Sequence, residues 1–211
     1  DRITASGNST GNLFYGDYGE PVIVTSGVGG DDWLTGARRV DTLIGASWIV
    51  RGTAVGGDDR LEGLAGNDVL YGDAILLDGL ARGGNDLLDG AAGDDLVAGD
   101  ARQIGGLATG GNDRLVGGQG NDALFGDASD VFFSSAVGGD DWLDGGQGDD
   151  SLYGDAWAFI GPSRGGSDRL EGGQGKDLLV GDARSFGTSA IGGDDWLYGG
   201  QGDDILVGDA V

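Results

Sequence analysis

The residues of this sequence that could do chemistry are aspartates that recur at a fixed spacing behind glycine-rich turns. The 211 residues include no cysteine and no histidine, which excludes thiolate sites, disulfides, Ser/His triads and most zinc sites. Acidic residues outnumber basic ones 36 to 12, so the formal net charge is −24. Carboxylate and carbonyl oxygens are the ligands of hard divalent cations, and flexible all-oxygen sites suit calcium better than magnesium. The pattern therefore predicts calcium sites.

Aligning the repeats places the predicted metal ligands in two columns. The first column consists of Asp32, Asp59, Asp86, Asp113, Asp141, Asp168 and Asp195. The second column consists of Asp68, Asp95, Asp122, Asp150, Asp177 and Asp204. In a stack of repeats, like charges about 5 to 7 Å apart repel each other unless a cation lies between successive turns. About a dozen calcium ions in two columns would offset the net charge of −24.

The spacing of the repeat predicts the fold. The motif GG(D/N/S)DxLx begins at Gly29, Gly56, Gly83, Gly110, Gly138, Gly165 and Gly192, at an almost constant interval. After each turn aspartate, outward and apolar inward positions alternate with the period of two that is typical of a β-strand. Frequent glycine disfavours a helix, by up to about 1 kcal/mol for each residue. We therefore expect an all-β fold, a right-handed parallel β-solenoid (β-roll or β-helix) with about 27 residues per coil and calcium-bound corners.

Each repeat unit divides into three segments of about nine residues, which we call nonads. When the units are aligned, each nonad contributes one apolar column. The first column is Leu34, Leu61, Leu88, Leu115, Leu143, Leu170 and Leu197, and the second is Leu43, Leu70, Val97, Leu124, Leu152, Leu179 and Leu206. The third column is Val50, Leu77, Ile104, Val131, Phe159 and Phe186. Three columns predict a coil with three inward faces. The alternative is a two-sided roll with the third nonad as a side loop.

The second nonad carries a family resemblance. The stretches GGQGNDALFGDA (117–128), GGQGDDSLYGDA (145–156), GGQGKDLLVGDA (172–183) and GGQGDDILVGDA (199–210) contain the pattern G-G-x-G-x-D-x-(apolar)-x. Over residues 29–211 the chain resembles the RTX, or hemolysin-type, calcium-binding repeats of proteins exported by bacterial type I secretion. The resemblance implies a calcium-loaded β-roll that is disordered at low calcium and folds outside the cell. It also implies that the turn aspartates and neighbouring carbonyls, such as those of Gly199, Gln201 and Asp203, are ligands.

Some positions depart from the repeat. In the first unit Arg39 replaces a corner glycine and Ala46 replaces the aspartate of the GDA triplet, so we expect little or no calcium at that corner. Ser167 and Lys176 lower the acidic charge of the sixth unit. We expect the other GDA aspartates to cap corners by accepting backbone N–H bonds, with direct ligation as the alternative. They are Asp17, Asp73, Asp100, Asp127, Asp155, Asp182 and Asp209.

Outward positions suggest two surface features. Trp33, Arg60, Leu87, Arg114, Trp142, Arg169 and Trp196 align on the first face, where neighbouring rings and guanidinium groups could form a cation–π ladder. The second face carries the apolar pairs Val69/Tyr71, Leu96/Ala98, Ala123/Phe125, Leu178/Val180 and Ile205/Val207. An exposed apolar stripe of this kind would be a contact surface for another chain or domain.

We divide the chain into a degenerate first repeat (1–28) and a calcium-binding solenoid of seven repeats (29–211). No apolar run is long enough for a membrane span, and a pI near 4.1 disfavours nucleic-acid binding. Nearly every polar residue recurs in each repeat, and neighbours such as Asp149 and Asp150 point to opposite sides of a strand, so we do not expect an enzyme.

The expected function is a calcium-binding structural module of a secreted or cell-surface bacterial protein, which folds when it meets calcium outside the cell. Neither end has a polar cap, so we expect part of a longer protein or a chain that stacks end to end. The alternative function is an adhesive, filament-forming or surface-layer-forming module that self-associates through its open ends or its apolar face.

Overall fold

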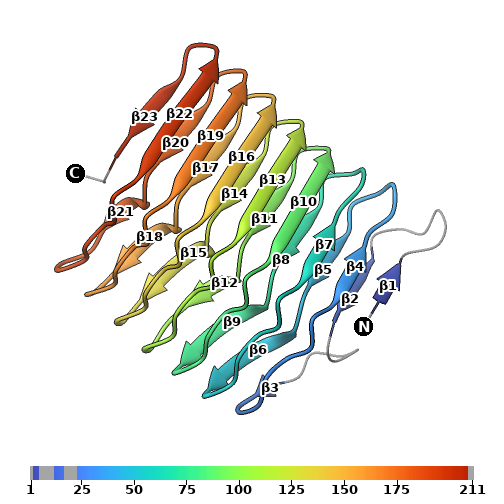
Figure 1. Cartoon of the computed structure of the whole chain (residues 1–211), viewed down its shortest axis with the longest axis vertical. Coiled ribbons are helices and arrows are strands. Elements are labelled where there is room, and N and C mark those ends of the chain that lie inside the picture. The colour runs from blue at the N-terminus through green and yellow to red at the C-terminus, as the bar shows by residue number, and fades with distance from the viewer. Residues whose placement is uncertain (1, 5–11, 17–22, 209–211) are drawn as a thin grey trace.

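The computed structural model describes residues 2–4, 12–16 and 23–208, which form a parallel β-solenoid (Figure 1). Each coil contributes one strand to each of three sheets, and every strand pairs in parallel with its equivalents in the neighbouring coils. Leu88, for example, pairs with Leu61 of the preceding repeat on one side and with Leu115 of the following repeat on the other. The predicted all-β solenoid and its period are confirmed, while the right-handed winding stays a prediction.

The three sheets are named A, B and C. Sheet A consists of β1 (Arg2–Thr4), β4 (Trp33–Thr35), β7 (Arg60–Glu62), β10 (Leu87–Ala92), β13 (Arg114–Gln119), β16 (Trp142–Gln147), β19 (Arg169–Gln174) and β22 (Trp196–Gln201). Sheet B consists of β2 (Leu13–Tyr15), β5 (Thr42–Ile44), β8 (Val69–Tyr71), β11 (Leu96–Ala98), β14 (Ala123–Phe125), β17 (Ser151–Tyr153), β20 (Leu178–Val180) and β23 (Ile205–Val207). Sheet C consists of β3 (Ile23–Val24), β6 (Ser47–Gly52), β9 (Ala74–Gly79), β12 (Ala101–Ile104), β15 (Ala128–Phe133), β18 (Ala156–Ile160) and β21 (Ala183–Phe186).

The first two apolar columns form one interior, the leucine core, between sheets A and B. Its twelve fully buried residues are Leu34, Leu43, Leu61, Leu70, Leu88, Val97, Leu115, Leu124, Leu143, Leu152, Leu170 and Leu179. Burying one such side chain stabilises the fold by roughly 1.5–3 kcal/mol. Both predicted columns are confirmed up to the last coil, where Leu206 is 46% exposed.

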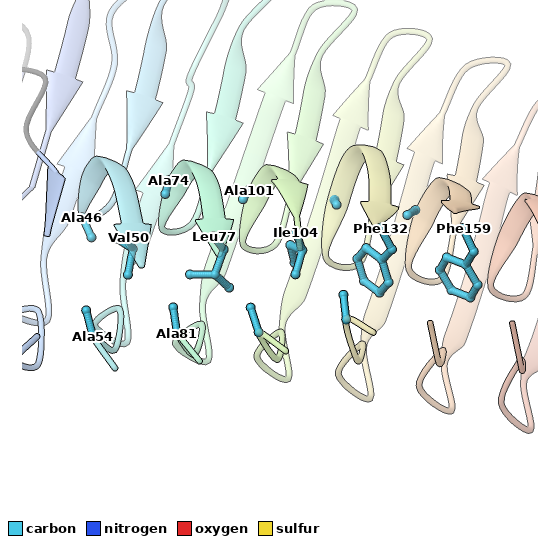
Figure 2. Packing of buried hydrophobic residues seen from close by; sticks show 14 of the residues in the cluster. Ala46, Val50, Ala54, Ala74, Leu77, Ala81, Ala101, Ile104, Phe132 and Phe159 are labelled. Atoms are coloured by element: carbon cyan, nitrogen blue, oxygen red, sulfur yellow. The ribbon is translucent and has the colours of Figure 1, made fainter. Parts of the chain in front are cut away.

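The third apolar column lies in a second, separate interior. Val50, Leu77, Ile104, Phe132 and Phe159 of sheet C pack against small residues of the segment that leads back to sheet A, such as Ala54 and Ala81. Figure 2 shows these side chains pointing into a row of stacked loops. We call this interior the alanine core. The rings of Phe132 and Phe159 stack within it, with centroids 5.0 Å apart.

The coil is therefore three-sided in its sheets, as predicted, but it has two interiors instead of one. The chain turns back tightly after each strand of sheet C, as at Gly52 with a φ of 72°, so the third face packs on its own return segment. One residue of the third column was assigned wrongly. The extra residue of the unit that begins at Gly110 forms a bulge in β15, so Phe132 is buried in place of Val131.

The outward ladder on sheet A is confirmed. Arg114 lies 3.7 Å from the ring centroid of Trp142, and Arg169 lies between Trp142 and Trp196 at 5.8 and 4.5 Å. Arg60 lies 5.3 Å from the ring centroid of Trp33.

The apolar stripe on sheet B is not the exposed surface that we expected. Its second residues Tyr71, Ala98, Phe125 and Val180 are at most 7% exposed, and Val207 in the last coil is half-buried. Side chains at the start of the sheet C strands cover them, as the contact between Tyr153 and Trp157 shows, with ring centroids 5.4 Å apart. The proposed lateral contact surface therefore loses most of its apolar area.

The described part of residues 1–28 joins the solenoid, because β1, β2 and β3 pair with β4, β5 and β6. Residues 1, 5–11 and 17–22 lie outside the described part of the chain, and so the division at residue 28 stays a prediction. Among the described residues, no helix is long and apolar enough to cross a membrane.

Candidate metal centre

The predicted ligands lie at two places in every coil. The first is the AB corner, which connects sheet A to sheet B; in the fifth unit it is GGQGDD, residues 145–150. Gly146 and Gly148 have φ angles of 100° and 132°, in a region that favours glycine. This turn brings Asp150 to the inner side of the corner, where it is 1% exposed.

The second place is the waist, which separates the leucine core from the alanine core. The chain crosses the waist twice in each coil: from sheet B to sheet C at a Gly-Asp pair such as Gly126–Asp127, and back to sheet A at a segment such as 138–141. Asp127 and Asp141 are 0% and 3% exposed. The waist is thus a layer of buried carboxyl groups between two apolar interiors.

In both places the predicted ligands from Asp59 onward cap the preceding coil. Oδ1 of Asp150 accepts the backbone N–H of Asp122 at 2.8 Å, and Oδ1 of Asp141 accepts that of Asp113 at 2.7 Å. The same bond recurs along both columns at 2.6 to 3.0 Å. One carboxylate oxygen therefore has a structural role that an amide could also perform.

In most coils the side chain of the residue before the predicted ligand accepts a backbone N–H of the following coil, and this residue is not always acidic. Oδ1 of Asp149 accepts the N–H of Lys176 in the following coil, and the amide oxygen of Asn121 accepts that of Asp149. At the waist the corresponding exposed column contains Asp58, Asn85, Asn112, Asp140 and Ser167. A neutral acceptor is thus sufficient in the exposed columns, whereas the buried inner columns contain only aspartate.

The second oxygen of the inner aspartates is buried and meets no donor within the described residues. This holds for Oδ2 of Asp68, Asp86, Asp95, Asp113, Asp122, Asp141, Asp150, Asp168 and Asp177. A buried polar atom without a partner costs about 1–3 kcal/mol, and more when it is charged. A bound cation would supply the missing partner.

Glycines shape the space in front of these oxygens. A Cβ atom on Gly126 would collide with Oδ2 of Asp141 and with the carbonyl oxygen of Gly154. At the AB corner, a Cβ on Gly145 would lie 2.5 Å from Oδ2 of Asp150 and 2.6 Å from the carbonyl oxygen of Gly172. Each place therefore brings a carboxylate and a carbonyl oxygen together in a cradle that a side chain would fill, and these donors fit calcium.

The carboxyl groups hold protons more tightly than free aspartate does. Burial raises the pKa of Asp68 and of Asp122 to about 7, and that of Asp150 to about 6, with the charges of neighbouring aspartates adding to the rise. At the waist, burial and then the neighbouring carboxylates raise the pKa of Asp86 and Asp141 well above the ordinary value. Two unit charges about 5 Å apart repel by about 3 kcal/mol at an effective dielectric constant near 20.

The aspartates of the GDA triplets cap the waist, as predicted. Oδ1 of Asp127 accepts the N–H of Gly139 at 3.0 Å, and Oδ1 of Asp155 accepts that of Gly166 at 2.9 Å. Asp73 and Asp182 make the equivalent bond with one oxygen, whereas both oxygens of Asp100 accept the N–H of Gly111. Asp17 and Asp209 lie outside the described residues. The nearly constant sequence separation between each GDA aspartate and the glycine that it caps was a signal that these side chains span the waist.

The AB corner of the first unit differs from the others. There the turn reads GARRVD, and Oδ2 of Asp41 accepts the backbone N–H of Ala37 at 2.6 Å. The oxygen that has no donor in the second to sixth units thus already accepts a hydrogen bond here. This bond supports the expectation that calcium binds poorly at that corner.

The thirteen predicted aspartates all lie at the AB corner or at the waist. Eleven of them are buried, and Asp195 and Asp204 in the last coil are half-buried. In the described part of the chain no three carboxylate side chains converge on one point. A cation would therefore need backbone carbonyls as well. The carbonyl of Gln201 already accepts the N–H of Gly175 at 2.8 Å, which leaves one lone pair for a metal.

Comparison with known proteins gives one match. The family model described as RTX calcium-binding nonapeptide repeat (4 copies) matches seven segments of the chain: 26–47, 53–74, 80–101, 107–130, 135–156, 164–183 and 192–210. No curated protein and no solved structure matches the chain significantly. The matched segments contain the AB corners and the waist of every unit.

Proposed function

Because this chain belongs to the RTX calcium-binding nonapeptide repeat family, we propose that it is a structural module whose thirteen inner aspartates bind about a dozen calcium ions and that folds when it binds them. The proposed ligands are the aspartates of the two predicted columns, at the AB corner and at the waist, together with backbone carbonyls of the glycine turns. Bound calcium would neutralise the stacked carboxylates and hold successive coils together.

One observation carries this proposal: inner aspartates such as Asp141 and Asp150 use one oxygen for a cap that an amide could make and bury the other without a donor in the described part of the chain. The neighbouring outer column needs only the cap, and it contains asparagine and serine as well as aspartate. A requirement for negative charge at the inner position explains the difference.

The charge of the whole chain supports coupling between calcium and folding. A chain with net charge −24 and 49 glycines resists compaction, because charges repel and glycine loses much backbone entropy on folding. For such a chain the free energy of metal binding is folding free energy. RTX repeats are typical of secreted bacterial proteins, so we propose a secreted or cell-surface location, where calcium is near millimolar.

Circular dichroism with calcium and with EDTA tests the proposal. We expect strand signal in millimolar calcium, loss of that signal in excess EDTA, and recovery when calcium is added back. Metal analysis after equilibrium dialysis should give about a dozen calcium ions per chain. A strand signal that survives complete removal of calcium would overturn the proposal.

A further inference from the structure

The waist contains two buried acidic columns, and the proposed function uses only one of them. Asp141 lies on the wall that leads from sheet C to sheet A, and Asp127 lies on the wall that leads from sheet B to sheet C. Both side chains are buried, between Leu124 and Leu143 of the leucine core and Ala136 of the alanine core. Their two columns run side by side, since the charge of Asp141 is, after burial, the main cause of the raised pKa of Asp127.

The cap uses only one of the two carboxyl oxygens of Asp127. Oδ1 accepts the N–H of Gly139, whereas Oδ2 is buried and meets no donor in the described part of the chain. Likewise, Oδ1 of Asp155 in the next coil accepts the N–H of Gly166, whereas its Oδ2 is buried and has no donor among the described residues. An asparagine would make the cap without burying a negative charge, as asparagines do in the exposed column beside the waist.

The unpaired oxygens of both walls point into glycine-lined space. A Cβ on Gly138 would lie 2.8 Å from Oδ2 of Asp127, and a Cβ on Gly126 would collide with Oδ2 of Asp141. Along the column, the carboxyl groups of Asp100 and Asp127 lie within hydrogen-bonding contact of each other. Two carboxylates at that separation need a proton or a cation between them.

We propose that Asp127 and Asp155, and by their place in the repeat also Asp73, Asp100 and Asp182, are calcium ligands as well as caps, so that the waist holds an internal row of calcium ions with a carboxylate from each wall. This inference rests on the proposed function and assigns to the GDA aspartates a role beyond capping.

The charges predict two classes of site. Each of the second to sixth units places two buried carboxylates at the waist, enough to balance one divalent cation, and one at the AB corner. Affinity for calcium rises with the number of charged ligands and with the rigidity of the site. Waist sites should therefore fill at lower calcium concentration than AB-corner sites.

The variants Asp127→Asn and Asp155→Asn, each in the full chain, test this assignment. The amide can still accept the N–H of Gly139 or Gly166, so each variant keeps the cap and loses one charged ligand. Asp140→Asn is the matched control, because Asn85 and Asn112 occupy its position in other coils. Calcium is counted by equilibrium dialysis and its affinity is measured by calorimetric titration, with circular dichroism as the check of folding.

We expect each waist variant to lose one calcium ion per chain or to weaken the tight class at least about tenfold, while the control keeps the wild-type count and affinity. Wild-type count and affinity in both waist variants would overturn the inference and leave the proposed function intact. Failure of the wild-type chain to bind calcium would instead overturn the proposed function.

A gain-of-site variant covers the case in which both waist variants fail to fold. Ala46 occupies the GDA aspartate position of the first unit, so Ala46→Asp should restore the missing carboxylate opposite Asp59. We expect one more calcium ion, or tighter binding, in a chain that otherwise folds as wild type. An unchanged count and affinity in Ala46→Asp would contradict the inference.

Discussion

At the scale of single residues, neighbouring aspartates in one turn have different roles. Asp149 faces solvent and contributes one acceptor oxygen, and Asn67 and Asn121 do the same in other coils. Asp150 contributes the same kind of bond and also buries an oxygen without a donor. Separate substitutions of Asp149 and Asp150 therefore distinguish the effect of the capping hydrogen bond from the effect of the buried charge.

We predict that Asp150→Asn and Asp149→Asn have different effects on calcium binding. Asp150→Asn keeps the bond from Asp122 and removes a proposed ligand, so calcium affinity should fall at least about tenfold, or 1.4 kcal/mol. In EDTA the same change should favour residual structure, because it removes one charge from a repelling column. Calorimetric titration and circular dichroism measure both effects. Equal effects of the two substitutions would count against a ligand role for Asp150.

The second position of the AB corner predicts a stabilising substitution. This position is Gly118, Gly146 or Gly173 in later units, but Ala91 in the third unit, with a φ of 71°. A non-glycine residue in this left-handed region costs about 1–2 kcal/mol. Ala91→Gly should therefore raise the free energy of unfolding in calcium by about 1 kcal/mol.

Gly146→Ala is the reverse control for this position. Its Cβ would collide with the carbonyl oxygen of Gly118 in the preceding coil, in addition to the strained φ. Unfolding by denaturant in excess calcium measures both variants. A loss of stability in Ala91→Gly would show that the methyl group contributes more than the strain.

At the scale of elements, the strands act as rungs of three ladders, and the sequence predicted two of them better than the third. A leucine or valine that lies two residues after each turn aspartate and two residues before the next glycine is enough to predict sheets A and B. In sheet C the apolar residue packs on an alanine four residues later, as Leu77 does on Ala81, and that pairing has no counterpart in the other nonads. The second interior, and with it the waist, could therefore not be derived from the nonad pattern alone.

The ladder on sheet A predicts a measurable pair energy. Arg114 lies over the ring of Trp142 at 3.7 Å, and Leu87 shows that leucine fits this column. A double-mutant cycle with Arg114→Leu and Trp142→Leu should give a coupling energy of about 0.5–1 kcal/mol, the range for an exposed cation–π contact. Thermal unfolding in excess calcium supplies the four free energies. Additive single effects would mean that the contact adds nothing beyond packing.

At the scale of the whole molecule, the strands of each coil pair only with those of the adjacent coils in the described part of the chain, and the proposed calcium ions lie between coils. Stability in such a stack is approximately a sum of coil and interface terms. Every interface also brings two negatively charged coils together, and a calcium ion bound there would reduce their repulsion. Each bound ion should therefore favour the ordering of the next coil. Calcium binding and folding should therefore be cooperative along the chain, and a partly loaded chain should be poorly populated.

The size of the particle in solution should consequently switch with calcium. An unfolded chain of 211 residues has a radius of gyration of about 50 Å, against about 17 Å for a compact one and somewhat more for an elongated stack. Small-angle X-ray scattering should show the large value in EDTA and the small one in millimolar calcium. Magnesium at the same concentration should leave the chain expanded, because it demands octahedral geometry and dehydrates reluctantly. If magnesium compacted the chain as well as calcium does, the collapse would reflect general charge screening, and the glycine-lined cradles would have no selective role.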